Sequence, residues 1–285
     1  MNFPPMPINQ QAISNAAAQY AKAAQEINTT EHQKLALSCI DLTTLNATDT
    51  VSGVAAFTQR VNNFQVHFRG LPDVAAICVY PNMASVVKEN LAVEGVNVAA
   101  VAGGFPSSMT FLALKEDEAR LAVVQGADEI DIVLPLWAFL EDNYAYCMQE
   151  VTGIKKAIGD AHLKVILESG VLTKPEAIWK ASILSLQAGA DFIKTSTGKL
   201  PVAATPEAAV VICHALKYWF ETTGEKRGFK PAGGIVATTD ALLYMAIVKD
   251  ILGDEWLNNQ LFRIGASRLA NNLLTDILGS KTAHF

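Results

Sequence analysis

Lys194, Lys230 and Asp131 each lie within a short apolar run that has the composition of a buried β-strand. A charge in such a position is costly unless it is paired or used, so each of the three needs an explanation. Side chains alternate along a strand, so if Ile130 and Ile132 face a helix layer, Asp131 faces the opposite way. We predict that all three charged groups point into one common interior.

A lysine beside a second lysine could act as a nucleophile towards a carbonyl carbon. At its ordinary pKa of about 10.4 a lysine is less than about 0.1% neutral at pH 7, and only the neutral amine attacks. A second ammonium about 5 Å away opposes the charge by roughly 3 kcal/mol at an effective dielectric of about 20, and burial adds to this. We predict that Lys230 lowers the pKa of Lys194 and that Lys194 forms a Schiff base. The alternative is that these residues form an ion-pair network with a purely structural role. Two neighbouring lysines argue against it, because like charges do not stabilise a core.

Glycine-containing turns follow the last three strand-like runs, at 197–199, 233–234 and 265–267. Glycine lets backbone N–H groups approach an anion, and the loops after strands seven and eight of a barrel are a recurrent phosphate site. Lys199 does not belong to a P-loop, because Ile193 and Leu200 stand where that motif needs Gly and Ser or Thr. Three such turns at successive strand ends predict a cradle for a phosphate group.

The elements that must position these residues alternate along the chain. Short β-rich runs lie near 36–43, 74–80, 96–102, 129–134, 163–168, 192–197, 228–232 and 262–266. Helical spacing occurs at 111–125, 144–158, 174–188, 206–220 and 239–252, and an Ala- and Gln-rich leading helix is predicted at 9–34. Eight strand–helix units in about 250 residues predict the α/β class and a single (β/α)8 TIM barrel with an extra N-terminal helix.

We divide the chain into an N-terminal helical extension, 1–34, and a (β/α)8 barrel catalytic domain, 35–285, because no linker or change of composition divides it further. The main alternative is an open doubly wound sheet. Such a sheet usually carries a G-x-G-x-x-G turn after its first strand, where this chain has Thr-Thr-Leu-Asn at 43–46.

Composition and charge argue against several classes of protein. The net charge of −6, with no basic stripe, does not predict nucleic-acid binding. With no secretion signal and no run of about 18 apolar residues, we expect a cytoplasmic protein that does not enter a membrane. The four cysteines are far apart and the five histidines are scattered, so neither disulfides nor a metal site is predicted. The G-x-S-x-G elbow of serine hydrolases does not occur.

Six blocks of sequence, in order over about residues 35–280, resemble the deoxyribose-phosphate aldolases, a family of class I, Schiff-base aldolases. The blocks are DLTTL (41–45), AICVYP (76–81), GADEID (126–131), FIKTSTGK (192–199), GFKPAGG (228–234) and FRIGAS (262–267). The resemblance implies reversible cleavage of 2-deoxy-D-ribose 5-phosphate to D-glyceraldehyde 3-phosphate and acetaldehyde, in the catabolism of deoxyribose phosphates.

The resemblance also implies roles for individual residues. Lys194 forms the imine, Lys230 lowers its pKa, and Asp131, with ordered water, relays protons. Asp41 and Thr43 line the sugar end of the site. The phosphate end is lined by Gly198, Lys199, Gly233, Gly234 and Ser267. From the same glycine-containing turns, we also expect Thr197 and Gly265 to bind the substrate. No cofactor or metal is implied, because the protonated imine is itself the electron sink. The implied partners are small phosphorylated sugars and aldehydes, and further copies of the chain, with a dimer expected.

The chain departs from the family pattern in two places. Many relatives have an Arg shortly after the Gly-Gly and a Ser-Ser pair after the eighth strand, where this chain has Ile235-Val236 and Ser267-Arg268. Arg268 either replaces the missing positive charge or faces solvent. Some relatives end in a Tyr that helps proton transfer, whereas this chain ends in His284-Phe285. Two other functions stay open, a transaldolase-like Schiff-base barrel and a non-catalytic phosphosugar-binding barrel.

Overall fold

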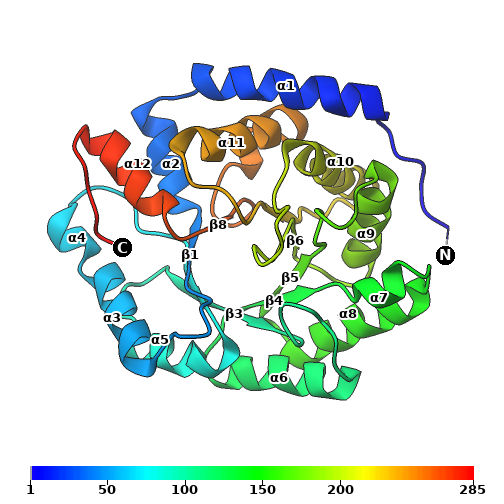
Figure 1. Cartoon of the computed structure of the whole chain (residues 1–285), viewed down its shortest axis with the longest axis horizontal. Helices are drawn as coiled ribbons and strands as arrows, with labels where there is room; N and C mark the ends of the chain where they lie inside the picture. Colours follow the sequence, from blue (N-terminus) through cyan, green and yellow to red (C-terminus); the bar gives the residue numbers. More distant parts are fainter. Residues whose placement is uncertain (1) are drawn as a thin grey trace.

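The computed structural model describes residues 2–285 and shows eight parallel β-strands around one axis (Figure 1). The strands are β1 (Ile40–Thr43), β2 (Ala76–Val79), β3 (Asn97–Ala102), β4 (Glu129–Val133), β5 (His162–Ile166), β6 (Phe192–Lys194), β7 (Gly228–Lys230) and β8 (Ile264–Ala266). β1 pairs with both β2 and β8, and the bridges Phe229–Phe262 and Ala232–Gly265 join the β7 and β8 segments. The predicted (β/α)8 barrel is therefore confirmed.

The helices form an outer layer around the strands (Figure 1). After β1 these are α3 (Val51–Asn62), α4 (Phe64–His67), α5 (Ala84–Asn90), α6 (Leu112–Val124), α7 (Leu136–Phe139), α8 (Tyr144–Ile158), α9 (Pro175–Gln187), α10 (Pro206–Thr223), α11 (Thr238–Leu252) and α12 (Leu269–Leu278), with 3-10 turns η1 (Pro81–Met83) and η2 (Asp254–Trp256). Within residues 2–285, no helix is both long enough and apolar enough to cross a membrane.

Two helices, α1 (Gln10–Glu26) and α2 (Thr30–Ser38), precede β1, where the sequence pattern predicts one helix over 9–34 and a strand from residue 36. The break has a local cause, because the Thr29 hydroxyl accepts a hydrogen bond from the backbone N–H of His32 and so caps a new helix. α2 then continues to Ser38, and β1 begins only at Ile40. α1 lies across α10 and α11 on the outside of the barrel (Figure 1).

The barrel wall separates two apolar clusters. Ile130, Ile132 and Leu134 face outward and belong to the large core that also contains the buried faces of the helices. A smaller cluster, built mainly by β2 and β3, consists of Leu45, Ala76, Cys78, Ala99 and Val101. The alternation predicted for β4 is thus confirmed, and Asp131 points inward, towards a half of the interior that is charged.

Candidate active site

The three charged residues expected to carry the chemistry meet inside the barrel. The amines of Lys194 on β6 and Lys230 on β7 donate hydrogen bonds to the same oxygen of Asp131, Oδ2, at 2.7 and 2.8 Å. The amine of Lys164 on β5 donates to the other oxygen, Oδ1, at 3.0 Å. Lys194 and Lys230 are register partners on adjacent strands, so the two lysines are close neighbours. All four side chains are buried.

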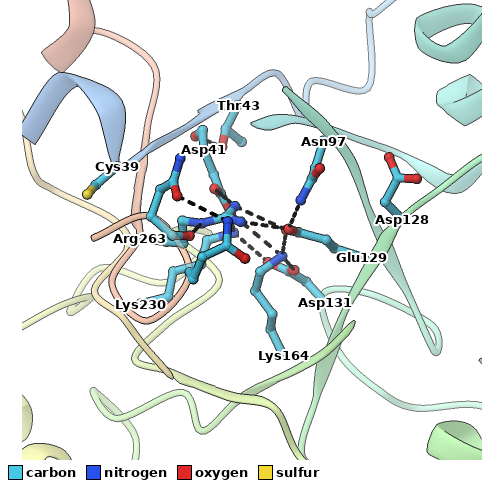
Figure 2. A network of polar contacts seen from close by, with 12 residues as sticks. Cys39, Asp41, Thr43, Asn97, Asp128, Glu129, Asp131, Lys164, Lys230 and Arg263 are labelled. Atoms are coloured by element: carbon cyan, nitrogen blue, oxygen red, sulfur yellow. Dashed lines mark hydrogen bonds and ion pairs between the residues drawn. The ribbon is translucent and has the colours of Figure 1, made fainter. Parts of the chain in front are cut away.

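A closed ring of alternating charges continues from Asp131 through the interior (Figure 2). Each member contacts the next, in the order Asp131, Lys230, Asp41, Arg263, Glu129, Lys164 and back to Asp131. Arg263 joins two carboxylates, with Nη1 at 2.7 Å from Asp41 Oδ1 and Nη2 at 2.8 Å from Glu129 Oε1. The Asn97 amide donates to Glu129 at 2.6 Å. We call these six charged side chains the interior ring; Lys194 is attached to it through Asp131.

The surroundings of Lys194 favour its neutral amine. Burial lowers the pKa of Lys194, and the ammonium of Lys230 lowers it further. The carboxylate of Asp131 acts in the opposite direction but does not outweigh them, so the pKa lies below the ordinary lysine value. This direction is the one that attack on a carbonyl requires, since it raises the neutral fraction at neutral pH.

Lys230 and Asp131, in contrast, are held in their charged forms. Burial lowers the pKa of Lys230, but the carboxylates of Asp131 and Asp41 outweigh it and leave the pKa above the ordinary value. Burial raises the pKa of Asp131, but the surrounding lysines outweigh it and leave that pKa well below the ordinary value. Lys230 therefore remains a cation beside Lys194 at neutral pH.

A cavity of about 270 Å³ lies at the C-terminal ends of β1, β6, β7 and β8, and Lys194 is part of its lining. Its wall contains all but one of the predicted substrate-binding residues, namely Thr43, Thr197, Gly198, Lys199, Gly233, Gly234, Gly265 and Ser267. Asp41 is the exception, because it is fully buried in the interior ring. The lining also includes residues without a predicted role, among them Leu45, Asn46, Ile235 and Val236.

The turns after β6 and β7 approach each other through glycines. Gly198 and Gly233 have φ angles of 73° and 86°, in the left-handed region that favours glycine. A Cβ on Gly233 would lie 3.0 Å from Gly198 Cα and 2.6 Å from Ala203 Cβ, so a side chain at 233 would force the turns apart. Glycine at these positions therefore allows the two backbones to form one wall of the cavity.

The loop after β5 holds the loop after β6 in place. The Thr197 hydroxyl donates to one carboxylate oxygen of Glu168 at 2.5 Å, and its backbone N–H donates to the other at 3.2 Å. The same hydroxyl accepts a hydrogen bond from the backbone N–H of Lys199 at 3.0 Å. Glu168 has a φ of 51°, which is uncommon for a residue with a side chain and indicates local strain.

The helices α11 and α12 both begin near the cavity, but they differ in how their first backbone N–H groups are capped. Asp240 accepts hydrogen bonds from the backbone N–H groups of Val236 and Ala237 at 3.1 and 2.8 Å, so it caps the start of α11. α12 begins directly after Ser267 and Arg268, and no side chain in the described part of the chain caps its first turn. Its first N–H groups are therefore suited to an anion. Arg268 itself is exposed and lines the cavity.

Lys199 spans the mouth of the cavity. Its side chain is exposed, and its amine donates a hydrogen bond to the backbone carbonyl of Leu45, in the loop after β1. The lysine thus lies between the loops that follow β1 and β6, where its charge is available to an anion bound beside the glycine-containing turns.

The sequence patterns assign no role to Arg263, Lys164 or Glu129, although these residues complete the interior ring. Lys164 and Glu129 lie in strands and alternate with apolar residues. This alternation was the signal in the sequence that could have placed them in the barrel interior. Arg263 directly precedes β8 and is buried with 1% of its surface exposed, a position that strand alternation alone does not identify.

The acidic side chains of the interior are paired with cations. Asp41 and Glu129 share the guanidinium of Arg263, and Asp131 is shared by lysines. Within residues 2–285, no group of three or more His, Cys, Asp or Glu side chains is placed to hold a metal ion.

The C-terminal residues pack against helices on the outside of the barrel (Figure 1). The ring of Phe285 stacks on Phe64 of α4 with ring centroids 5.4 Å apart. The side chain of Asn271 on α12 accepts hydrogen bonds from the backbone N–H groups of His284 and Phe285 at 2.8 and 3.0 Å. Neither His284 nor Phe285 lines the cavity.

An eight-stranded parallel barrel with a buried lysine in the cavity at the C-terminal ends of its strands has the architecture of a (β/α)8-barrel enzyme. The chain belongs to the DeoC/LacD family of aldolases, which residues 35–271 match. The resemblance inferred from the six sequence blocks is therefore confirmed, and the chain is an aldolase.

Individual relatives cover most of the chain. A Caenorhabditis elegans protein is 46% identical over 94% of this chain and 88% of its own length. The human deoxyribose-phosphate aldolase is 41% identical over 88% of this chain and 82% of its own length. A solved structure from Toxoplasma gondii has a TM-score of 0.76 at 24% identity, covering 90% of this chain and 97% of that one, which is a likeness of fold.

Proposed function

We propose that this chain reversibly cleaves 2-deoxy-D-ribose 5-phosphate to D-glyceraldehyde 3-phosphate and acetaldehyde through a Schiff base on Lys194. One observation carries the proposal: an amine whose pKa is lowered lines the same cavity as the glycine-containing turns after β6, β7 and β8. A substrate with a carbonyl at one end and a phosphate at the other matches these two features. The name of the human relative gives further support.

The covalent part of the reaction follows from the position of Lys194. Its neutral amine attacks C1 of the open-chain sugar to give a carbinolamine, which loses water to form a protonated imine. The imine draws electrons from the C2–C3 bond; this bond breaks as the 3-hydroxyl loses its proton, releasing glyceraldehyde 3-phosphate and leaving an enamine. Protonation at C2 and addition of water then release acetaldehyde and restore the amine.

Asp131 and Lys230 support these steps. Asp131 Oδ2 accepts the hydrogen bond of the Lys194 amine at 2.7 Å and so orients that nitrogen. Its contact with Lys230 at 2.8 Å keeps the second cation beside the reacting amine. We assign the proton transfers of carbinolamine collapse and enamine formation to Asp131 acting through water.

The phosphate would lie against the backbone of the glycine-containing turns. Gly198 and Gly233 line the cavity and α12 starts uncapped beside it, so their N–H groups would be the donors to the phosphate, and Lys199 would add a charge at the mouth. Thr43, at the end of β1, lines the same cavity as Lys194 and would contact the sugar. Asp41, buried in the interior ring, would act on the sugar end through Lys230 rather than by contact.

Reductive trapping tests the proposal directly. The protein is incubated with acetaldehyde and borohydride, digested, and the modified lysine is located by mass spectrometry. We expect one added ethyl group, on Lys194, and none in the Lys194→Ala variant. Lys199→Ala is the matched control, because its lysine lines the same cavity but is exposed, and it should still be labelled at Lys194. A label on Lys164, Lys199 or Lys230 would contradict the assignment.

Product analysis separates this reaction from that of a transaldolase-like enzyme. With 2-deoxyribose 5-phosphate alone, acetaldehyde should appear together with glyceraldehyde 3-phosphate in equal amounts. A transaldolase-like enzyme would instead need a ketose donor and would hold a three-carbon unit on the lysine. A non-catalytic barrel would bind the sugar phosphate without forming either product.

The assembly and location of the protein remain proposals. We propose that it forms a homodimer, to be tested by light scattering coupled to size-exclusion chromatography. We also propose a cytoplasmic location, to be tested by fractionation of cells that express the tagged protein. Its substrates, small phosphorylated metabolites and aldehydes, are consistent with that location.

A further inference from the structure

The interior ring is balanced in charge without Lys194. Three carboxylates, those of Asp41, Glu129 and Asp131, alternate with three cations, those of Lys164, Lys230 and Arg263. Each of these side chains is buried. Lys194 is the seventh member of the network, so it adds an uncompensated positive charge whenever it is protonated.

Charged side chains are not the only way to fill the interior of this barrel. The other half of the interior is filled by small apolar side chains such as Ala76 and Val101, which shows that apolar packing is available to this fold. A buried ion pair is often less stabilising than apolar residues of similar volume. Glu129 and Arg263 nevertheless form a double contact, at 2.8 and 3.2 Å, on the side of the ring away from Lys194.

We propose that Glu129 and Arg263 are positioning residues that set the charge balance of the interior ring, and that this balance, together with Lys230, keeps Lys194 a neutral amine. The inference rests on the proposed Schiff-base function of Lys194. Arg263 is shared by Asp41 and Glu129, Lys230 by Asp41 and Asp131, and Lys164 by Glu129 and Asp131, so three cations balance three carboxylates. Without Arg263, the ring would lack one positive charge, and protonation of Lys194 would supply it.

The charged and titratable groups around Lys194 come from several strands and do not all act in the same direction: Lys230 favours the neutral amine, whereas Asp131 favours the charged form. Asp131 on β4 forms an ion pair with Lys194, and Lys230 on β7 is its neighbour on the adjacent strand. Cys78 on β2 is a third titratable group near Lys194. Burial raises the pKa of the Cys78 thiol, so Cys78 adds no charge at neutral pH. Glu168, in the loop after β5, is bound to Thr197 outside the ring.

Lys164 on β5 reaches Lys194 through Asp131. Burial lowers the pKa of Lys164, but Asp131 and Glu129 outweigh it and keep this lysine charged. Burial likewise lowers the pKa of Arg263, but Asp41 and Glu129 raise it above its already high ordinary value. The three cations of the ring are therefore charged at neutral pH, and we expect Lys194 to be the group that responds to a change in their number.

The proposal can be tested by removing either the positive or the negative charge of the Arg263–Glu129 contact. In the full-length protein, the rate of acetaldehyde and borohydride labelling at Lys194 is measured against pH to obtain its apparent pKa. Arg263→Gln should raise that pKa by about one unit and Glu129→Gln should lower it by about one unit, the size expected for a charge about 10 Å away at an effective dielectric of about 20. The double variant Glu129→Gln/Arg263→Gln restores the balance and should return the pKa to near the wild-type value.

Arg263→Lys is the conservative variant, since it keeps the charge but not the double contact, and its profile should stay near that of the wild type. If Arg263→Gln does not fold, the shift of Glu129→Gln to lower pH and the profile of Arg263→Lys still decide the question. Single variants that lose activity with an unmoved profile, or that shift in the same direction, would overturn the inference. Lack of any label on Lys194 in the wild-type protein would instead overturn the proposed function, and the inference with it.

Discussion

Gly265 on β8 lies directly against the side chain of Lys230. A Cβ added at Gly265 would be 3.3 Å from Lys230 Cε and 2.8 Å from the Cβ of Ala232. The first contact is tight and the second forces a shift, so the absence of a side chain at 265 leaves the space through which Lys230 reaches Asp131 and Asp41. Gly265 therefore serves the interior as well as the cavity wall.

This contact makes Gly265→Ala a test of how closely Lys230 must be held. We expect a fall in kcat of at least about tenfold, because displacement of the Lys230 amine weakens its effect on Lys194. Overpacking of this kind also costs about 1–3 kcal/mol of stability, which thermal unfolding should detect. Gly153→Ala on α8 is the matched control, since its Cβ would meet the flexible end of Glu116 away from the site. Equal kcat values for the two variants would show that the contact has no effect on catalysis.

Replacing Lys230 by Leu removes one cation from beside Lys194. Lys194 should then become protonated to neutralise Asp131, and its pKa should rise towards the ordinary lysine value. Near pH 7 we expect kcat to fall at least about 100-fold, from roughly 3 kcal/mol of lost repulsion. The neutral fraction of Lys194 grows about tenfold per pH unit below its pKa, so the deficit should shrink as pH rises. Lys230→Arg should keep more activity than Lys230→Leu, whereas a loss that is independent of pH would indicate a role by contact instead of charge.

Arg268 occupies the exposed rim of the cavity beside the start of α12. If it replaces the positive charge that relatives carry after the Gly-Gly, Arg268→Ala should raise KM for 2-deoxyribose 5-phosphate by about five- to tenfold and leave KM for unphosphorylated 2-deoxyribose unchanged. Steady-state kinetics with both substrates measure the difference. Equal effects on the two substrates would place Arg268 outside phosphate recognition.

The proposed mechanism needs no metal, because the protonated imine accepts the electrons of the breaking bond. Activity should therefore be unchanged after incubation with EDTA and removal of the chelator. The metal content of the protein is measured before and after treatment, to show that any bound metal has been removed. A loss of activity that added zinc restores would show that a metal takes part in the reaction.

The fold and part of the site could be predicted because they follow from short-range patterns. The β-rich runs and the helices between them gave the barrel, and the alternation Ile130, Asp131, Ile132 placed the aspartate inside. The leading helix was wrong in its limits, because composition does not show that Thr29 starts a second helix. The cavity-lining glycines were predicted from their position after strands, which is also a local property.

The depth and partners of the interior side chains were decided by the tertiary structure alone. Alternation places both Asp41 and Thr43 on the inner face of β1, yet Thr43 lines the cavity and Asp41 lies in the interior ring. Arg263 reaches Glu129 across the barrel, although 134 positions separate them in the chain. The direction of a side chain depends on the two-residue repeat of its own strand, which the sequence records. Its height in the barrel and the charge it meets depend on the stagger between strands, which is set only when the barrel closes.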